Sequence, residues 1–431
     1  MDSNKIAQYD APHHFEPLMP EAHKLGPLLE LASDLAGPAT TLGSSAASAA
    51  QVELRALLRS MNSYYTNRIE GEHTRPSDID SALQKNFSTN ADLARKQRLA
   101  VAHIRTEKFC EDQLDARSAA GEDVKQWLFS AEALEWLHKQ LFEGLDDKDL
   151  ALADGTSMQP GQLRGRQVAV GRHEAPAFGA LPLFIQRWSA VYSGVRRGEA
   201  SIVAIAASHH RLAWMHPFVD GNGRLARLHS HLLLHAAGLT HGLWSPLRGF
   251  ARTEQQYRDY LQAADEHRRG DLDGRGNLTQ AGLIAWIEYT VKTCIDQVHF
   301  MGNQLNVAGM QDRISAALTF EETTLKSGVR QAALRPLHYL FATQPELGRA
   351  DFKSMTGLGD RVATDALSAL LKHGYLVSDS PYGKVRFGIP RHALRFYFPS
   401  LWPEAEQDAA MVMSQRRPAT QATPAARRPK S

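Results

Sequence analysis

The stretch that decides how this chain is understood reads His216-Pro217-Phe218-Val219-Asp220-Gly221-Asn222-Gly223-Arg224-Leu225-Ala226-Arg227. Helical patterns precede it over residues 201–215 and follow it over residues 223–237. Gly221 and Gly223 allow backbone conformations that are closed to other residues, so several N–H groups can turn toward one point. A helix that begins there directs the positive end of its dipole at the same point. The stretch therefore predicts an anion site at a helix N-terminus.

The side chains of this stretch have the chemistry of a phosphate-handling site. Arg224, in the first helical turn, can hold phosphate oxygens through its planar guanidinium group. Asp220 is placed beside those phosphates to bind Mg²⁺, which prefers one carboxylate together with phosphate oxygens. His216 can take the proton from an incoming hydroxyl, and the apolar Phe218 is interpreted as an anchor in the core. Each residue alone is more often structural than catalytic, but the complete pattern predicts nucleotidyl or phosphoryl transfer to a hydroxyl.

Composition limits the class of protein. A chain of 431 residues exceeds what one core usually fills, which predicts two or three domains, and its 43% hydrophobic and 22% charged residues are typical of a soluble protein. The net charge is +2, but residues 414–431 carry +5, which leaves −3 for the rest and argues against a broad nucleic-acid surface. Cys110 and Cys294 form neither a disulfide framework nor a metal-binding spacing. With no secretory or membrane-spanning pattern, we expect a cytoplasmic protein without a membrane partner.

Periodicity along the chain predicts a mainly α fold with two small β elements. In residues 163–171, Val168, Ala169 and Val170 form a short β-like run bounded by glycines, interpreted as a hairpin flap. Three short helices and two strands within 325–395 give a winged-helix outline. The expected organisation is an irregular segment 1–50, a helical region 51–120, a core 121–305, a winged-helix-like domain 325–395 and a disordered basic tail 404–431.

The central stretch resembles the signature of the Fic family, His-x-Phe-x-Asp-Gly-Asn-Gly-Arg-x-x-Arg, with every defining position filled. The resemblance implies an all-α core with a flap over the site, and transfer of AMP from ATP to a Ser, Thr or Tyr hydroxyl of a target protein. It implies that His216 is the general base and that Asp220 is the Mg²⁺ ligand. It also implies a catalytic role for Asn222 and Arg224, and a phosphate cradle made of Gly221, Asn222, Gly223 and Arg224. Arg227 would contact the outer phosphates, and Tyr257 would contact the nucleobase. The target protein would dock on Val168, Ala169 and Val170.

A second signal lies upstream, at Thr66-Asn67-Arg68-Ile69-Glu70-Gly71. It resembles the inhibitory motif of the same family, Ser/Thr-x-x-x-Glu-Gly/Asn, with Thr66, Glu70 and Gly71 at the defining positions. A glutamate at the end of a helix can pair with an arginine through two hydrogen bonds. If the partner is Arg227, that arginine is no longer available to the γ-phosphate, which predicts autoinhibition. In some family members the same glutamate also supports removal of AMP, and the sequence leaves that alternative open.

Three alternatives remain at the level of sequence. His231 and His235, four residues apart on the helix after the motif, are a candidate pair of zinc ligands, although no Glu follows His231 and no third ligand has an obvious spacing. The winged-helix outline suggests a DNA-binding regulator, but its candidate recognition helix mixes Arg361 and Lys372 with acidic residues. Transfer of another phosphate-linked group is a third alternative. The target, the modified residue and self-association into a homo-oligomer stay open.

Overall fold

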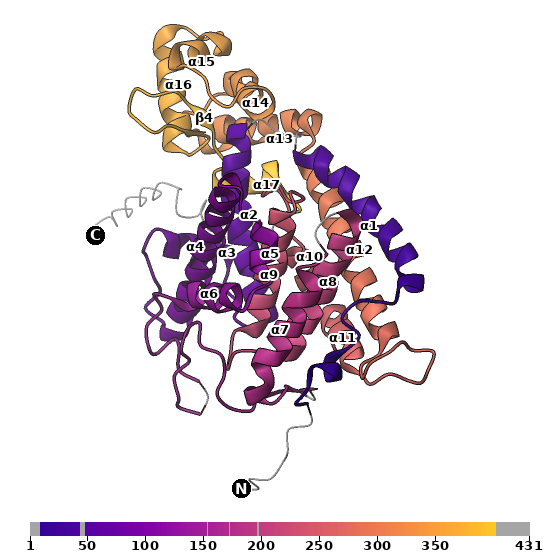
Figure 1. The fold of residues 1–431 in the computed structure, drawn as a ribbon. Helices are drawn as coiled ribbons and strands as arrows, with labels where there is room; N and C mark the ends of the chain where they lie inside the picture. The colour runs from indigo at the N-terminus through magenta and orange to yellow at the C-terminus, as the bar shows by residue number, and fades with distance from the viewer. Residues whose placement is uncertain (1–8, 44–47, 153, 172, 196–197, 402–431) are drawn as a thin grey trace, which may run out of the picture. The chain divides into compact units, whose positions relative to one another are not determined.

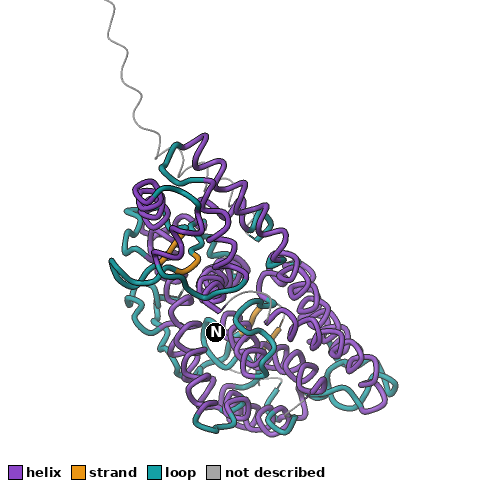
Figure 2. Tube along the Cα trace, turned by 90° about the horizontal axis from the view of Figure 1, so that it is seen from above, coloured by secondary structure: helices purple, strands orange, loops and turns teal. Residues whose placement is uncertain are grey.

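The computed structural model describes residues 9–43, 48–152, 154–171, 173–195 and 198–401. It divides into two compact units, Met1–Val307 and Ala308–Ser431. Helices dominate both units, and the strands are short and few among the described residues (Figure 2). The predicted fold class, mainly α with a small hairpin in the core region, is confirmed. No helix in the described ranges is long and apolar enough to cross a membrane.

The first unit is a packed set of helices (Figure 1). Their bounds are a 3₁₀ turn Pro12–Phe15, α1 Ala22–Gly43, α2 Ser48–Ile69, α3 Pro76–Leu83, α4 Ala91–Ala119, α5 Val124–Leu128, α6 Ala131–Phe142, a 3₁₀ turn Phe178–Ala180, α7 Leu181–Tyr192, α8 Gly198–Met215, α9 Asn222–Ala236, α10 Leu247–Arg252, α11 Glu254–Asp265 and α12 Gln280–Gln304. The helix α8 packs on α9 and α12, and α4 packs on α2 and α9. The helices that hold the two sequence motifs therefore share one core.

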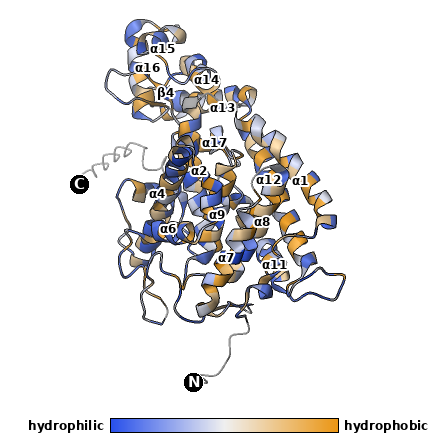
Figure 3. Ribbon diagram, in the orientation of Figure 1, coloured by the Kyte–Doolittle hydropathy of each residue, from blue (hydrophilic) through white to orange (hydrophobic). Residues whose placement is uncertain are grey.

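Local sequence explains where several of these helices begin. Asn90, Asp123, Ser130 and Thr279 each accept a hydrogen bond from a first-turn N–H of α4, α5, α6 and α12, respectively. Such N-caps satisfy backbone donors that have no partner within the helix. Hydrophobic and hydrophilic residues are interleaved along most helices (Figure 3), as amphipathic helices in a packed bundle require.

The prediction of an irregular segment over residues 1–50 is wrong for most of its length. The helix α1 spans Ala22–Gly43 and contains Pro27 and Pro38 within it. Its buried residues recur at helical spacing and are Leu28, Ala32, Leu35, Ala39 and Leu42. This face packs against α12 and α8, and α1 runs alongside α12 in Figure 1. The two prolines disfavour a helix and led to the prediction of an irregular segment. Burial of the apolar face outweighs that helix-breaking tendency.

The predicted flap is a two-stranded antiparallel hairpin. Strand β1 is Ala169–Val170 and strand β2 is His173–Glu174, with Ala169 opposite Glu174 and Val170 opposite His173. The Val168 carbonyl also accepts a hydrogen bond from the Ala175 N–H at 3.2 Å. Both residues of β1 are exposed, and the side chain of Val170 is among the exposed large hydrophobic groups. The hairpin therefore presents an outer edge to solvent.

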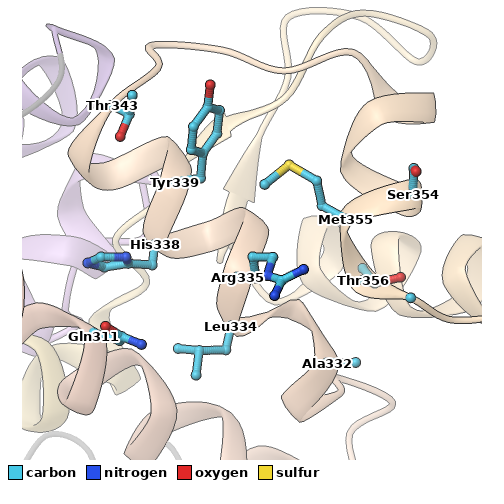
Figure 4. A pocket seen from close by; sticks show the side chains of 11 residues that line it. Gln311, Ala332, Leu334, Arg335, His338, Tyr339, Thr343, Ser354, Met355 and Thr356 are labelled. Atoms are coloured by element: carbon cyan, nitrogen blue, oxygen red, sulfur yellow. The ribbon is translucent and has the colours of Figure 1, made fainter.

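The second unit contains the helices α13 (Val307–Thr319, which begins at the end of the first unit), α14 Leu334–Ala342, α15 Arg349–Thr356, α16 Asp360–Lys372 and α17 Leu394–Tyr397. A π-helical turn covers Phe320–Leu325, and 3₁₀ turns cover Gln331–Ala333 and Arg391–Ala393. The strands β3 Leu376–Val377 and β4 Arg386–Phe387 pair antiparallel. Residues of α13, α14 and α15 line a pocket of about 660 Å³, where Arg335 and Tyr339 of α14 lie across from Met355 of α15 (Figure 4). The winged-helix interpretation of residues 325–395 stays a prediction, and the tail 404–431 lies outside the described residues.

Candidate active site

His216 lies where α8 ends and the catalytic loop begins. Its backbone φ is +48°, an unusual value for a residue with a side chain, and such positions are concentrated at functional sites. The ring Nδ1 lies 3.4 Å from the Ala213 carbonyl. Burial lowers the pKa of His216 to about 4. The imidazole is therefore neutral at physiological pH and retains a lone pair that can accept a proton.

Asn222 holds the loop in shape. Its Oδ1 accepts the Phe218 N–H at 2.9 Å, and its Nδ2 donates to the Phe218 carbonyl at 2.8 Å. Both side chains are buried, and Phe218 is the apolar anchor expected from the sequence. A side-chain amide that satisfies both backbone groups of one residue fixes that residue within a tight loop. The amide of Asn222 thus stabilises the geometry of the loop.

The N-terminus of α9 has the backbone geometry on which the predicted anion site depends. Gly221 has φ +78°, and a Cβ atom at that position would collide with the Phe142 ring. The Gly221 carbonyl accepts the Leu225 N–H at 2.9 Å, so the intrahelical ladder begins there. The N–H groups of the turn before Leu225 have no acceptors inside the helix, as in every first turn. These donors and the helix dipole favour a negative charge at this point.

Asp220 and Arg224 flank the same turn. The Asp220 side chain is 52% exposed, its Oδ1 accepts the Gly221 N–H at 2.6 Å, and its Oδ2 lies 4.0 Å from the Arg224 guanidinium. Arg224 itself is buried, and its Nε has no hydrogen-bond partner among the described residues. A buried guanidinium nitrogen without a partner is an unmet donor. The pair therefore offers an accessible carboxylate and a cation ready for an anionic ligand.

His138 of α6 supports this loop, and the sequence reasoning missed it. Its Nδ1 accepts the Gly161 N–H at 2.8 Å, so the proton resides on Nε2, which donates to the Asp220 carbonyl at 3.1 Å. The ring stacks on Phe218 with 3.8 Å between centroids. Burial lowers the pKa of His138 to about 4, which keeps this tautomer neutral. No local motif marks His138, because its partners lie in other segments of the chain.

Arg164 joins the flap to the catalytic loop and was also missed. Its Nε donates to the His216 carbonyl at 2.8 Å, its Nη2 donates to the Pro176 carbonyl at 2.5 Å, and its backbone N–H donates to the Pro217 carbonyl at 2.9 Å. The side chain is 3% exposed. The only available signal was the residue type, an arginine next to the β-like run. Through these bonds the hairpin and the backbone of His216 hold one another in place.

The upstream motif ends helix α2 in a defined way. The Gly71 N–H donates to the Arg68 carbonyl at 2.9 Å, and the Glu72 N–H donates to the Asn67 carbonyl at 2.8 Å. Gly71 has φ +78°. This pair of bonds with a left-handed glycine is the Schellman arrangement, which stops a helix and fixes its last residues. Glu70 is thereby placed at the helix terminus.

The structure brings this motif and Arg227 together. The Arg227 Nε donates to Thr66 Oγ1 at 2.8 Å, and its Nη2 donates both to the Thr66 carbonyl at 3.3 Å and to the Glu70 carboxylate. Arg227 is 1% exposed. Burial raises the pKa of Glu70, but the charges of Arg227 and Arg224 outweigh burial and leave that pKa below its ordinary value. Glu70 is therefore an ionised partner of Arg227 at physiological pH.

Glu70 also lies against the first turn of α9. A Cβ atom on Gly223 would collide with Glu70 Oε1 and would come within 3.2 Å of Arg227 Nη1. Only a glycine permits this approach. The carboxylate of Glu70 is thus a negatively charged group at the anion site itself.

Tyr257 of α11 is 3% exposed and lies beside this cluster. Its hydroxyl is 3.0 Å from His209 Nε2, and Arg227 is among the charges that act on it. The side chain packs against the Phe250 ring at 4.9 Å between centroids. The described contacts of Tyr257 are with core residues and with Arg227. Its expected role at the nucleobase stays a prediction.

Comparisons with known proteins point to one family. Residues 128–234 match the model of the Fic/DOC family. The proteins named Protein adenylyltransferase Fic from Drosophila mojavensis and Drosophila grimshawi are each 31% identical over 153 residues, which is 35% of this chain. The protein of that name from Culex quinquefasciatus is 34% identical over 120 residues, or 27% of this chain. The matches span 29%, 30% and 22% of the length of those three proteins.

Solved structures to which this chain is similar at low identity include two Fic proteins. A Fic family protein from Desulfovibrio desulfuricans G20 is 17% identical, covers 88% of this chain and 98% of its own, and has a TM-score of 0.49. Fic-1 from C. elegans is 15% identical, covers 65% of this chain and 73% of its own, and has a TM-score of 0.46. The matched residues 128–234 contain the complete loop His216–Arg227. The family model and the curated relatives together show that this part of the chain is similar to proteins of the Fic/DOC family.

Proposed function

We propose that this protein is an adenylyltransferase that transfers AMP from ATP to a Ser, Thr or Tyr hydroxyl of a target protein and of itself. The curated relatives are named as protein adenylyltransferases, which supports this activity. A neutral, half-buried imidazole beside a helix N-terminus that can bind an anion supports it independently. The target protein and ATP are the partners that the proposal requires.

In the proposed reaction His216 acts on the incoming hydroxyl. The imidazole takes the hydroxyl proton while the oxygen forms a bond to the α-phosphorus of ATP, and the bond from that phosphorus to the β-phosphate bridge breaks, releasing pyrophosphate. The first-turn N–H groups of α9 and the Arg224 guanidinium stabilise the charge on the phosphate oxygens. Asn222 keeps the loop in the conformation that presents those donors.

Mg²⁺ fits the residues of this site. The carboxylate of Asp220 is half exposed and adjoins the proposed anion site. Its Oδ1 accepts the hydrogen bond from the Gly221 N–H, whereas its Oδ2 takes no part in that bond. Mg²⁺ prefers one carboxylate together with phosphate oxygens, so we assign Asp220 as its protein ligand. The bound ion would supply charge neutralisation on the phosphates.

We further propose that the helix end at Thr66–Gly71 inhibits the enzyme, and the contact of Glu70 with Arg227 carries this part of the proposal. Arg227 is already bonded by Thr66 and Glu70, so its guanidinium is not available to an outer phosphate. The Glu70 carboxylate beside Gly223 also repels a phosphate from the anion site. ATP would therefore bind in a pose that does not react.

The target segment is proposed to add to the flap at Val168, Ala169 and Val170. The outer edge of β1 is exposed, and an extended peptide can pair with such an edge through main-chain hydrogen bonds. Arg164 holds this hairpin to the His216 backbone. A hydroxyl on the docked segment would then be presented toward the imidazole.

Auto-modification with ATP and Mg²⁺ tests the proposal. Glu70→Gly should raise labelling on the order of tenfold or more, because hydrogen bonds between charged groups contribute about 1.5–3 kcal/mol. Adding His216→Ala to that variant should lower labelling by about 10²–10⁴-fold. Glu72→Gly is the matched control, since Glu72 pairs with Arg95 rather than Arg227, and it should leave labelling unchanged.

Intact-protein mass spectrometry distinguishes the transferred group. An added mass equal to AMP supports adenylyl transfer, whereas an added phosphate would contradict it. If Glu70→Gly labels itself no better than the wild-type chain while Glu72→Gly behaves normally, the autoinhibition is refuted.

A further inference from the structure

A second polar cluster lies inside the first unit, away from the catalytic loop. The helix α4 presents His103, Glu107 and Glu111 at successive intervals of four residues, which places them on one helix face. They face His231 of α9. All four side chains are 3% exposed or less. The proposed transfer reaction uses none of them.

The donor atoms of this cluster lie close together. His231 Nε2 is 2.8 Å from Glu111 Oε1 and 3.6 Å from Glu107 Oε1. His103 Nδ1 is 3.7 Å from Glu107 Oε2. One ligand atom from each of Glu107, Glu111 and His231 lies within 4.8 Å of the others. Ligands at about 2.0 Å from a tetrahedral ion are roughly 3.3 Å apart, so small side-chain movements suffice to bring them around one ion.

Several of these atoms lack the partners that buried polar groups normally have. Within the described residues, both ring nitrogens of His103 and Oε2 of Glu107 accept or donate no hydrogen bond. Leaving such groups unsatisfied in the core is costly, and most native structures avoid it. His103 Nδ1 and Glu107 Oε2 face one another at 3.7 Å. An unpartnered buried imidazole next to an unpartnered carboxylate oxygen indicates a missing positive ligand.

The helix α2 orients the two carboxylates from the other side. Arg59 donates two hydrogen bonds to Glu111 Oε2, at 2.9 Å and 2.5 Å, and Asn62 donates to Glu107 Oε1 at 2.7 Å. Glu111 Oε1 and Glu107 Oε2 are left facing the two histidines. Outer hydrogen bonds of this kind fix carboxylate ligands in protein metal sites.

Charge also favours a cation at this position. Arg59 supplies one positive charge against the two buried carboxylates.

We propose that His103, Glu107, Glu111 and His231 bind one zinc ion in the core of the first unit. Two imidazoles and two carboxylates are a donor set that suits Zn²⁺, whereas Mg²⁺ and Ca²⁺ prefer oxygen ligands alone. The set differs from the pair suggested by sequence spacing, because His235 is 2.8 Å from Asp115 instead. Four protein ligands leave no open position, so the site is structural rather than hydrolytic.

The cluster lies one helical turn away from each of the two sequence motifs. His231 follows Arg227 by one turn on α9, and Asn62 precedes Thr66 by one turn on α2. A bound ion would hold α4 and α9 together next to the helix that ends at Glu70. Zinc binding itself does not depend on the proposed transfer activity, so either proposal can fail without the other.

Metal analysis of the full chain tests the site. After purification and exhaustive dialysis the wild-type chain should retain about one equivalent of zinc, and its removal with a chelator should lower the Tm on the order of 5 °C. Zn²⁺ added back should restore the Tm, and Mg²⁺ in excess should not. Co²⁺ in place of zinc should give the intense visible absorption of a tetrahedral site.

Two variants and a matched control identify the ligands. Glu107→Gln keeps the shape and can still accept the Asn62 hydrogen bond, and His231→Gln removes the α9 ligand; each should lose the equivalent of zinc while helical circular dichroism is retained. His235→Gln, one turn along the same helix, should keep it. A wild-type chain that holds no zinc and gains no Tm with Zn²⁺, or a Glu107→Gln chain that still binds one equivalent, would overturn the site.

Discussion

At the scale of single residues, His216 is kept neutral by burial rather than by a charged partner. The described contact of its Nδ1 is a carbonyl at 3.4 Å, and burial lowers its pKa to about 4. An ordinary exposed histidine has a pKa of about 6.5 and is therefore half protonated near pH 6.5. The loop therefore maintains a proton acceptor over a wider acidic range than an exposed imidazole would provide.

This gives a prediction for the titration of the ring. Between about pH 8 and pH 5.5 the His216 ring should stay neutral, because protonation begins only as the pH approaches its lowered pKa. The ring resonance can be followed by NMR and assigned by its disappearance in His216→Ala. A midpoint near pH 6.5 for that resonance would contradict the prediction.

Arg227 is the residue on which the proposed autoinhibition depends. It is bonded at once to the hydroxyl and carbonyl of Thr66 and to the carboxylate of Glu70. A buried arginine needs such partners, because an unpaired guanidinium in the core is strongly destabilising. The same requirement means that removing Glu70 leaves a cation able to attract the outer phosphates of ATP.

At the scale of elements, the end of α2 is as important as its length. The Schellman arrangement at Gly71 stops the helix directly after the residue that pairs with Arg227. Without this stop, the chain after Ile69 would have no fixed direction. The glycine of the inhibitory motif is therefore a geometric requirement.

We predict that Gly71→Ala destabilises the chain by about 1 kcal/mol and raises auto-modification. No atom lies within 4 Å of a Cβ at this position, so the cost comes only from the left-handed backbone. Denaturant unfolding monitored by circular dichroism measures the change.

Gly37→Ala is a control of opposite sign. Gly37 lies inside α1, its Cβ would also meet no atom within 4 Å, and alanine favours a helix over glycine by about 0.8–1 kcal/mol. Gly37→Ala should leave stability unchanged or raise it. Equal effects of the two substitutions would refute the backbone explanation.

At the scale of the whole molecule, all predicted site residues lie in the first unit. The loop His216–Arg227, the helix end Thr66–Gly71 and the hairpin Ala169–Glu174 fall within Met1–Val307, and the second unit begins at Ala308. A compact unit with its own core is expected to fold alone.

We therefore predict that a chain ending at Asn306, between α12 and α13, folds and keeps the activity. With Glu70→Gly in both, the shortened chain should label itself to within about twofold of the full chain, since every predicted site residue lies in the unit that is kept. Circular dichroism checks folding, and the ATP labelling assay checks activity. Loss of labelling in a folded fragment would show that the second unit contributes to the site.

Much of the site could be predicted because its geometry is local. Gly221 and Gly223 set the turn, Asn222 bonds to Phe218 four residues away, and Gly71 stops its own helix. Each of these interactions joins residues within one or two turns, so a short stretch of sequence contains both partners. The amphipathic helices from residue 48 onward follow the same rule.

Only the tertiary structure decided which distant residues meet. Glu70 and Arg227 are 157 positions apart, and Arg164 and His138 reach the catalytic loop across 52 and 82 positions. Helix α1 forms despite its prolines because α8 and α12 cover its apolar face, and the carboxylates of α4 find His231 in the same way. The sequence by itself determined the chemistry of the loop, whereas helix packing determined its partners, because packing depends on side chains that no local pattern connects.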